Sequence, residues 1–160
     1  MHKPLLAAAL VLLLAAPAVS QSAKPDFSGT WTLDVAKSDF GPAPAPKSIV
    51  HVVEHKEPSL KISSTQVTEQ GETTNVRNIS TDGKENTNTM RAMGGEQEIK
   101  STTAWDANKL VTNLKVTIQG MTADIVDSWD LSADGKVLTI SRQFKTSQGD
   151  FAQKTLFTRK

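Results

Sequence analysis

The sequence predicts an all-β fold, a single antiparallel up-and-down β-barrel of about 8–10 strands. Apolar and polar residues alternate with a period of two in short runs from residue 48 to the end of the chain, as in strands that bury one face. Turn signals that contain Gly, Pro or Asn separate these runs at short intervals, which is typical of a meander of hairpins. No long segment shows the 3.6-residue period of a helix.

The elements follow in order along the chain. We expect the first strand in "FSGTWTLD", residues 27–34, followed by one helical turn within 35–40. Alternate prolines in 41–46 exclude a helix or a central strand, so this segment should connect elements over one end of the fold. The remaining strands are expected at 48–56, 59–67, 73–80, 84–91, 96–105, 109–119, 121–132, 136–146 and 150–159.

Closure into a barrel is inferred from the length of the meander. An open sheet of so many sequentially paired strands would leave two exposed edges, and closure removes both. A sandwich of two sheets is the alternative, because hairpins alone do not establish closure.

The N-terminal residues 1–20 have the pattern of a secretory signal peptide. Lys3 precedes an apolar run from Leu5 to Ala16, and small residues at 18 and 20 suit cleavage before Gln21. We therefore expect an exported protein, periplasmic or extracellular, with a short lead at 21–26 and one barrel domain at 27–160. No later segment approaches the roughly 20 apolar residues of a membrane span, so no integral membrane segment is expected. The chain has no Cys, which in an exported protein favours a bacterial envelope.

Composition argues against several partners. The net charge is +1, the basic residues are scattered, and aromatic residues make up 5% of the chain, so we expect no nucleic acid partner. His51 and His55 fall on one face of an expected strand, where they would lie about 13 Å apart. Zinc ligands must be much closer together, so no metal is expected, and no motif indicates another cofactor.

Pairing the last five expected strands across two-residue loops keeps one apolar face throughout. A one-residue error in any loop would have moved the apolar residues to the other face, so the agreement supports the pairing. It sets Trp129 opposite Ile140, Asp127 opposite Arg142, Arg142 opposite Thr155, and Arg159 opposite Leu138. The candidate ligand-binding residues on this inner face are Thr103, Thr112, Leu114, Ile125, Asp127, Trp129, Ile140, Arg142, Phe144 and Thr155.

Two opposite charges, Asp127 and Arg142, lie on this otherwise apolar and hydroxyl-rich face. Neither charge could be buried alone without a large free-energy cost, so we expect them to pair across the strands. The pair could be a packed device that fixes the register. It could also belong to the wall of a cavity and orient the polar group of a ligand.

The run "FSGTW" resembles the start of the lipocalin and fatty-acid-binding (calycin) barrels. Trp31 and Arg159 match the tryptophan and late arginine that close the barrel base in that superfamily, so the resemblance implies structural roles for both. The longer run "SGTWTLDVAKSDFGPAPAP" is similar to small exported bacterial lipocalin-like proteins. Prolines stand where fatty-acid-binding proteins have a helical lid, and the helix and cysteines of secreted lipocalins are missing. The resemblance implies a barrel and a cavity, and no particular ligand.

Three functions remain open. The leading hypothesis is an exported noncatalytic protein that binds a small apolar or amphipathic molecule inside the barrel. The alternative is an envelope protein-interaction or structural module with a filled barrel. An enzyme with Asp127 as general base and Arg142 as electrostatic stabiliser is less favoured, because the sequence has no known nucleophile, phosphate or metal motif.

Overall fold

The computed structural model describes residues 24–92, 95–118 and 121–160, so the expected signal peptide lies outside the described residues. Ten antiparallel strands form one sheet in the order β4-β3-β2-β1-β10-β9-β8-β7-β6-β5. A short 3-10 helix, η1 (Val35–Lys37), follows the first strand, as the sequence predicts. The strands are β1 (Gly29–Leu33), β2 (Ser48–Lys56), β3 (Ser59–Thr68), β4 (Gly71–Ser80), β5 (Asp82–Ala92), β6 (Gly95–Asp106), β7 (Lys109–Ile118), β8 (Met121–Leu131), β9 (Val137–Thr146) and β10 (Gly149–Arg159).

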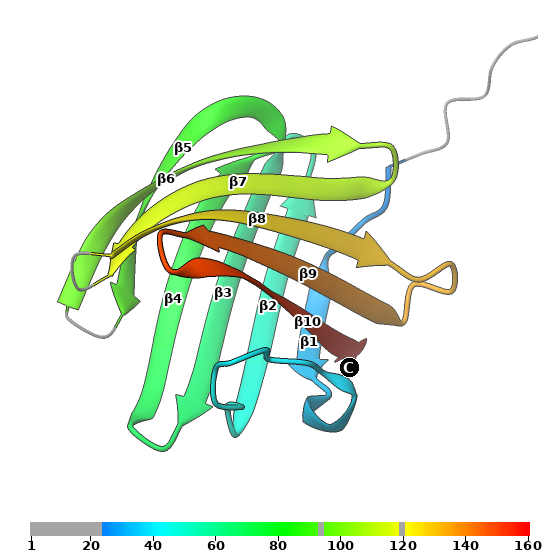
Figure 1. Ribbon diagram of the computed structural model, residues 1–160. Coiled ribbons are helices and arrows are strands. Elements are labelled where there is room, and N and C mark those ends of the chain that lie inside the picture. Colours follow the sequence, from blue (N-terminus) through cyan, green and yellow to red (C-terminus); the bar gives the residue numbers. More distant parts are fainter. Residues whose placement is uncertain (1–23, 93–94, 119–120) are drawn as a thin grey trace, which may run out of the picture.

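The sheet curls into a nearly closed barrel. In Figure 1, β2–β4 form one wall and β6–β9 cross in front of them as the other wall. The expectation of an all-β antiparallel barrel is confirmed, and the alternative of a sandwich of two sheets does not apply, because all ten strands belong to one sheet. Within the part of the chain described, no helix has the length and hydropathy of a membrane span.

The predicted register is confirmed for three hairpins and is wrong for the last one. Trp129 pairs with Ile140 and Asp127 pairs with Arg142. In the β9–β10 hairpin every pair is shifted by two residues: Arg142 faces Gln153, and Thr155 faces Ile140. Leu138 likewise faces Phe157 in place of Arg159. A two-residue shift preserves the inner face, so the residues assigned to the interior stay there.

The shift arises in the turn. The ladder begins at the pair Thr146–Gly149, one residue earlier than expected on each side of the loop. The hydroxyl of Thr146 donates to the carbonyl of Gly149 and accepts from the N–H of Gln148. Thr68 and Gly71 begin the β3–β4 hairpin in the same way. The hydrogen bonds of the Thr146 side chain thus stabilise a turn at residues 147–148, one residue before the expected Gln148-Gly149 turn.

Aromatic packing seals one end of the barrel. Trp31 is fully buried and its indole N–H donates to the carbonyl of Phe27 at 2.9 Å. Arg159 is the cross-strand partner of Trp31, and its guanidinium lies 4.5 Å from the indole ring centre. Gly29 has φ +131°, a backbone conformation that other residues rarely adopt, so glycine suits this position beside Arg159. The expected Trp31–Arg159 contact is confirmed.

The barrel is not closed by a backbone ladder. The sheet ends at β4 and β5, and no ladder joins these two strands among the described residues. Side-chain amides join them instead. Asn88 accepts from the N–H of Asn78 at 2.7 Å and donates to its carbonyl at 3.0 Å. Asn86 makes the same two contacts with Ser80, and Asn75 makes them with Arg91.

Each of these side-chain amides replaces a backbone peptide group, because it presents one acceptor and one donor to the backbone of the opposing strand. We call this contact, made by Asn75, Asn86 and Asn88, the asparagine seam. It explains why the stretch "NVRNISTDGKENTNT" is polar on both faces. The expectation that closure removes both sheet edges is therefore corrected: the edges remain, and side chains satisfy them.

Replacing Asn88 with Ala should weaken the seam. Two hydrogen bonds to the Asn78 backbone are lost in a partly hydrated position, so the free energy of unfolding should fall by about 1–2 kcal/mol. Asn113→Ala on the exposed outer face of β7 is the matched control and should change stability by less than about 0.5 kcal/mol. Urea unfolding measures both, and hydrogen exchange of the Asn78 amide should accelerate only in Asn88→Ala. Equal effects of the two substitutions would contradict the role of the seam.

Candidate functional site

The barrel encloses a cavity of about 360 Å³ between its two walls. The proline segment lies over one end of it, as expected, and contributes Phe40, Ala43, Pro44 and Pro46 to the lining. Backbone contacts hold the segment at both ends. Asp39 pairs with Lys154 of β10, and the N–H of Lys47 donates to the carbonyl of Val67 in β3 at 2.8 Å. The proline segment therefore covers this end of the cavity and is held there by backbone hydrogen bonds.

Most of the lining is apolar, and a group of four interacting polar residues lies in the lining and next to it. The apolar residues include Ile49 of β2, Met90 of β5, Ile99 of β6 and Phe157 of β10. The polar group consists of His51, Arg77, Asp127 and Arg142, which influence one another electrostatically. An apolar wall with a few convergent polar groups is the usual composition of a small-molecule site.

Asp127 and Arg142 form the expected cross-strand ion pair. Arg142 Nε donates to Asp127 Oδ1 at 2.5 Å and Nη2 donates to Oδ2 at 2.6 Å, a bidentate arrangement. Asp127 is 1% exposed, whereas 37% of the Arg142 side chain remains accessible and lines the cavity. The Asp127 carboxylate raises the pKa of Arg142, and burial opposes this effect. The pair thus presents its cationic side to the cavity.

Arg77 is a second cation in the cavity, and the sequence analysis missed it. It projects inward from β4, opposite Ile62 of β3, and lines the cavity. No carboxylate of the described residues lies within ion-pair distance of its guanidinium. Burial lowers the pKa of Arg77, Asp127 raises it, and the neighbouring Arg142 lowers it further. An arginine nevertheless stays protonated in a protein, so two cations line the cavity and one buried carboxylate lies next to them.

His51 completes the polar group. It is 8% exposed and lies against the ring of Phe157, with 4.6 Å between ring centres. Burial lowers its pKa to about 3, and the charges of Arg77 and Arg142 add to the lowering, while Asp127 opposes it. The imidazole is therefore neutral at physiological pH, and the polar group carries a net charge of about +1.

The structure brings most of the predicted site residues together. Seven of them line the cavity: Leu114, Ile125, Trp129, Ile140, Arg142, Phe144 and Thr155. The other three, Thr103, Thr112 and Asp127, are buried and are not part of its lining. Thr103 and Thr112 satisfy each other through a hydroxyl contact of 2.9 Å. Alternation along β4 places Arg77 on the same face as Ile79, and this periodicity is the signal that could have revealed it.

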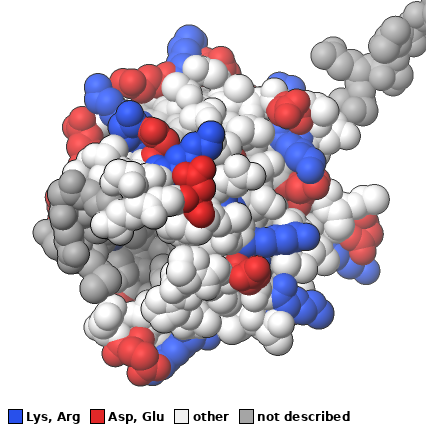
Figure 2. Space-filling model, in the orientation of Figure 1, with Lys and Arg blue, Asp and Glu red and all other residues white. Residues whose placement is uncertain are grey.

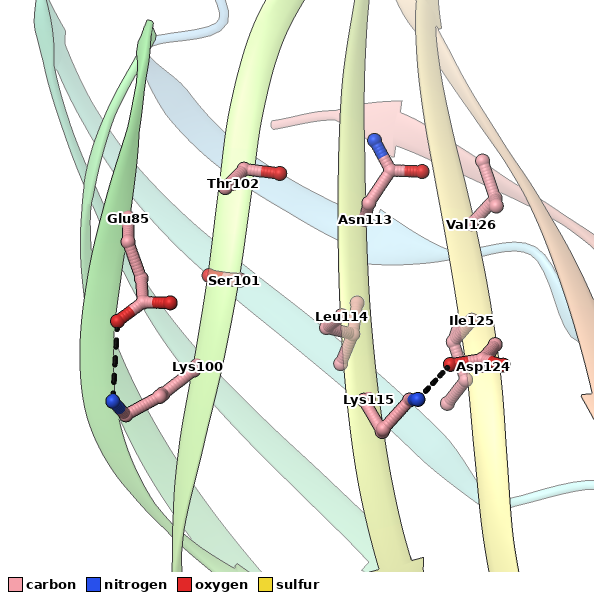
Figure 3. Close-up of a pocket in the computed structure, with 10 residues that line it drawn as sticks. All are labelled: Glu85, Lys100, Ser101, Thr102, Asn113, Leu114, Lys115, Asp124, Ile125 and Val126. Carbon is pink, nitrogen blue, oxygen red and sulfur yellow. Dashed lines mark ion pairs between the residues drawn. The ribbon is translucent and has the colours of Figure 1, made fainter.

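A second hollow lies on the outer face of β5–β8 (Figure 3). Two ion pairs cross it, Lys100 with Glu85 and Lys115 with Asp124, each at 3.2 Å. All four side chains are exposed, so water already satisfies them and screens the pairs. The interior cavity, with its buried polar group, is therefore the candidate functional site.

The visible outer face carries no dominant charge. Figure 2 shows Lys and Arg mixed with Asp and Glu over this face, without a basic stripe. Among the described residues no group of His, Cys, Asp and Glu is arranged to hold a metal ion. On this face no cluster of one sign of charge marks a site for a charged ligand.

Solved structures share this fold. A secretory abundant heat soluble protein from Ramazzottius varieornatus superimposes with a TM-score of 0.59 at 14% identity, covering 88% of this chain and 98% of the other. Zebrafish ileal bile acid-binding protein, complexed with cholic acid, gives 0.57 at 15% identity over 84% and 98% of the two chains. Secretory abundant heat soluble protein 4 from R. varieornatus gives 0.55 at 11% identity over 83% and 94%.

The chain shares the antiparallel barrel fold of these structures. No protein-family model matches the sequence, and no curated protein is similar enough to count as a match. The resemblance that "FSGTW" and Arg159 suggested is confirmed at the level of the fold. At such low identities the likeness concerns the fold alone, so the function must be argued from the cavity.

Removing Asp127 alone should destabilise the barrel more than removing the whole ion pair. Asp127→Leu leaves Arg142 and Arg77 facing each other in the cavity, and the free energy of unfolding should fall by about 3 kcal/mol. The double variant Asp127→Leu/Arg142→Met should recover more than half of this loss. Urea unfolding of the four members of the cycle measures the coupling. Additive effects of the two substitutions would show that the pair contributes no coupling.

His51 should make stability depend on pH in the acidic range. The folded state holds the pKa of His51 at about 3, whereas the unfolded chain takes up the proton near pH 6.5. The unfolded state therefore binds more protons between these values, and stability falls as the pH is lowered through this window. Compared with His51→Phe, the wild type should lose about 3 kcal/mol more between pH 7 and pH 4.

The measurement is urea unfolding of both proteins at several pH values. Above pH 7.5 the difference between them should be constant, because His51 is neutral in both states there. Parallel curves between pH 7 and pH 4 would show that His51 does not resist protonation in the folded protein.

Proposed function

We propose that this protein is an exported, noncatalytic carrier that binds a small amphipathic anion inside its barrel. The observation that carries the proposal is Arg77, a cation in the cavity without a carboxylate partner among the described residues. The apolar lining would hold the ligand's hydrocarbon part. A negatively charged head group would lie between Arg77 and the exposed side of Arg142.

The balance of charges favours an anion over a neutral ligand. Asp127 is committed to Arg142 through two short hydrogen bonds. Arg77 keeps its charge in a partly buried position, which costs free energy in the empty protein. A carboxylate, sulfate or similar group would satisfy Arg77 with charge-assisted hydrogen bonds.

The cavity weighs against a filled barrel that acts only through its surface. Its volume of about 360 Å³ falls within the range of small-molecule sites. Catalysis finds little support, since Asp127 is 1% exposed and its carboxylate is held by Arg142. A general base must reach the proton that it removes, and Asp127 does not line the cavity.

The comparisons add an example of such binding on the same fold. Zebrafish ileal bile acid-binding protein, which shares the fold, is complexed with cholic acid, an amphipathic acid. Export is supported by the signal-peptide pattern of residues 1–20, and we place the carrier in a periplasm or outside the cell. There it would shield a poorly soluble acid from water.

The test compares an acid with an alcohol of the same length. Dodecanoic acid and dodecan-1-ol are titrated by displacement of a fluorescent anilinonaphthalene sulfonate from the wild type, from Arg77→Met and from Arg91→Met. Arg91 is the matched control, because its side chain is exposed and pairs with Glu96 on the surface.

Arg77→Met should weaken binding of the acid about 10- to 100-fold, since hydrogen bonds to charged groups contribute about 1.5–3 kcal/mol. Binding of the alcohol should change little, and Arg91→Met should behave as the wild type. Arg77→Met should fold at least as well as the wild type, because it removes a charge without an ion-pair partner. Equal affinity for acid and alcohol, or no saturable binding of either, would contradict the proposal.

A further inference from the structure

We propose that His51 selects a hydroxylated ligand, by hydrogen bonding to a hydroxyl group placed a few carbons from the anionic head. The proposal rests on the proposed function and narrows its ligand class to hydroxylated amphipathic acids. It assigns His51 a role in specificity, separate from the attraction of charge by Arg77 and Arg142.

Packing fixes the ring of His51 in the cavity wall. On β2 it faces Trp31 of β1 and Ser64 of β3. The ring lies between two aromatic neighbours, Phe157 at 4.6 Å and Trp129 at 6.1 Å between ring centres. Such a ring has little freedom to turn toward another partner, so its hydrogen-bonding atoms keep their direction.

The polar atoms of His51 are not fully used by the protein. Its Nδ1 is buried and has no hydrogen-bond partner, and no described residue forms a hydrogen bond with its Nε2, the nitrogen that remains accessible. Buried polar groups are nearly always satisfied, and one that is not costs about 1–3 kcal/mol. The aromatic packing alone could be made by Phe, so it does not account for a histidine here. A cavity-lining residue with unused hydrogen-bonding capacity points to a ligand.

The protonation state selects the kind of ligand group. A neutral imidazole has one donor and one acceptor nitrogen, and the pKa of about 3 keeps His51 neutral at physiological pH. A carboxylate can only accept, so it matches the two arginines better than it matches His51. A hydroxyl group both donates and accepts, and it can therefore bond to the accessible Nε2 of the ring in either tautomer.

Strand pairing places the hydroxyl near the head group. His51 faces Ser64, Ser64 faces Asn75, and Arg77 is the next inward residue after Asn75. Two strand spacings and one two-residue step separate the backbones, about 10 Å across the sheet and about 7 Å along it. Both side chains project into the same cavity and shorten this separation. A ligand whose anion meets Arg77 thus brings its first few carbons toward His51.

The experiment measures a ratio of affinities. Dodecanoic acid, 2-hydroxydodecanoic acid and 3-hydroxydodecanoic acid are titrated against the wild type, His51→Phe, His51→Gln and His55→Phe. His51→Phe keeps an aromatic ring against Phe157 and removes the nitrogens. His51→Gln restores a neutral donor and acceptor. His55 belongs to the closed end and does not line the cavity, so His55→Phe is the matched control.

In the wild type, at least one hydroxy acid should bind about 3- to 10-fold more tightly than dodecanoic acid, as expected for one net hydrogen bond. This ratio should fall to about 1 in His51→Phe, recover at least partly in His51→Gln and persist in His55→Phe. The 15N chemical shifts of the His51 ring should change with the preferred hydroxy acid and much less with dodecanoic acid.

Two results would overturn the proposal and leave carrier function intact. One is tight binding of dodecanoic acid with no preference for either hydroxy acid, as when a water molecule satisfies His51. The other is a preference that persists unchanged in His51→Phe. If none of the three acids binds, the proposed function fails, and this inference fails with it.

Discussion

One carboxylate, Asp127, faces two guanidinium groups inside the barrel, and this imbalance shapes the rest of the site. The bidentate contact with Arg142 fixes β8 against β9 and leaves the carboxylate no remaining face toward the cavity. Arg77 then stands without an ion-pair partner, and the two cations together help to keep His51 neutral. The ion pair thus joins β8 to β9, and because it engages Asp127 it leaves the charge of Arg77 unpaired, which makes the polar group cationic. The two explanations that the sequence left open for this pair are compatible.

The strand that carries Arg77, β4, is also one of the two strands at which the barrel closes. β4 is an edge strand, and the asparagine seam joins it to β5 where a backbone ladder would otherwise run. Amide side chains at the surface exchange with water more readily than buried ladder bonds do, so this seam should be among the less stable contacts of the sheet. Asn75 belongs to the seam and also lines the cavity, next to Arg77 on the same face of β4. The strand that carries Arg77 is therefore joined to β5 by side-chain amides and not by a backbone ladder.

The sequence predicts the inner face well because the side chains of a strand alternate with a strict period of two. The pairs Trp129–Ile140 and Asp127–Arg142 follow from that period together with short loops.

The residues at which a hairpin loop begins and ends are harder to predict from the sequence. The pattern Thr-x-Gln-Gly occurs at 68–71, 117–120 and 146–149, and in the first and last the Thr pairs directly with the Gly. In the second, Thr117 pairs with Thr122, so the same four residues are compatible with two registers.

The sequence analysis missed Arg77 and considered His51 only as a metal ligand, for a different physical reason. The alternation of side chains can place both residues on the inner face of the barrel. It does not show which hydrogen-bond or ion-pair partners a side chain has in three dimensions. Arg77 lies in a segment whose polarity reflects the asparagine seam, which hides an inward cation among residues that satisfy backbone groups. His51 lies in an apolar strand where a histidine usually completes a packed core. The three-dimensional structure distinguishes the two pairs of residues by their hydrogen-bond and ion-pair partners. Asp127 and Arg142 bind each other, whereas Arg77 and His51 keep hydrogen-bonding groups that a ligand could use.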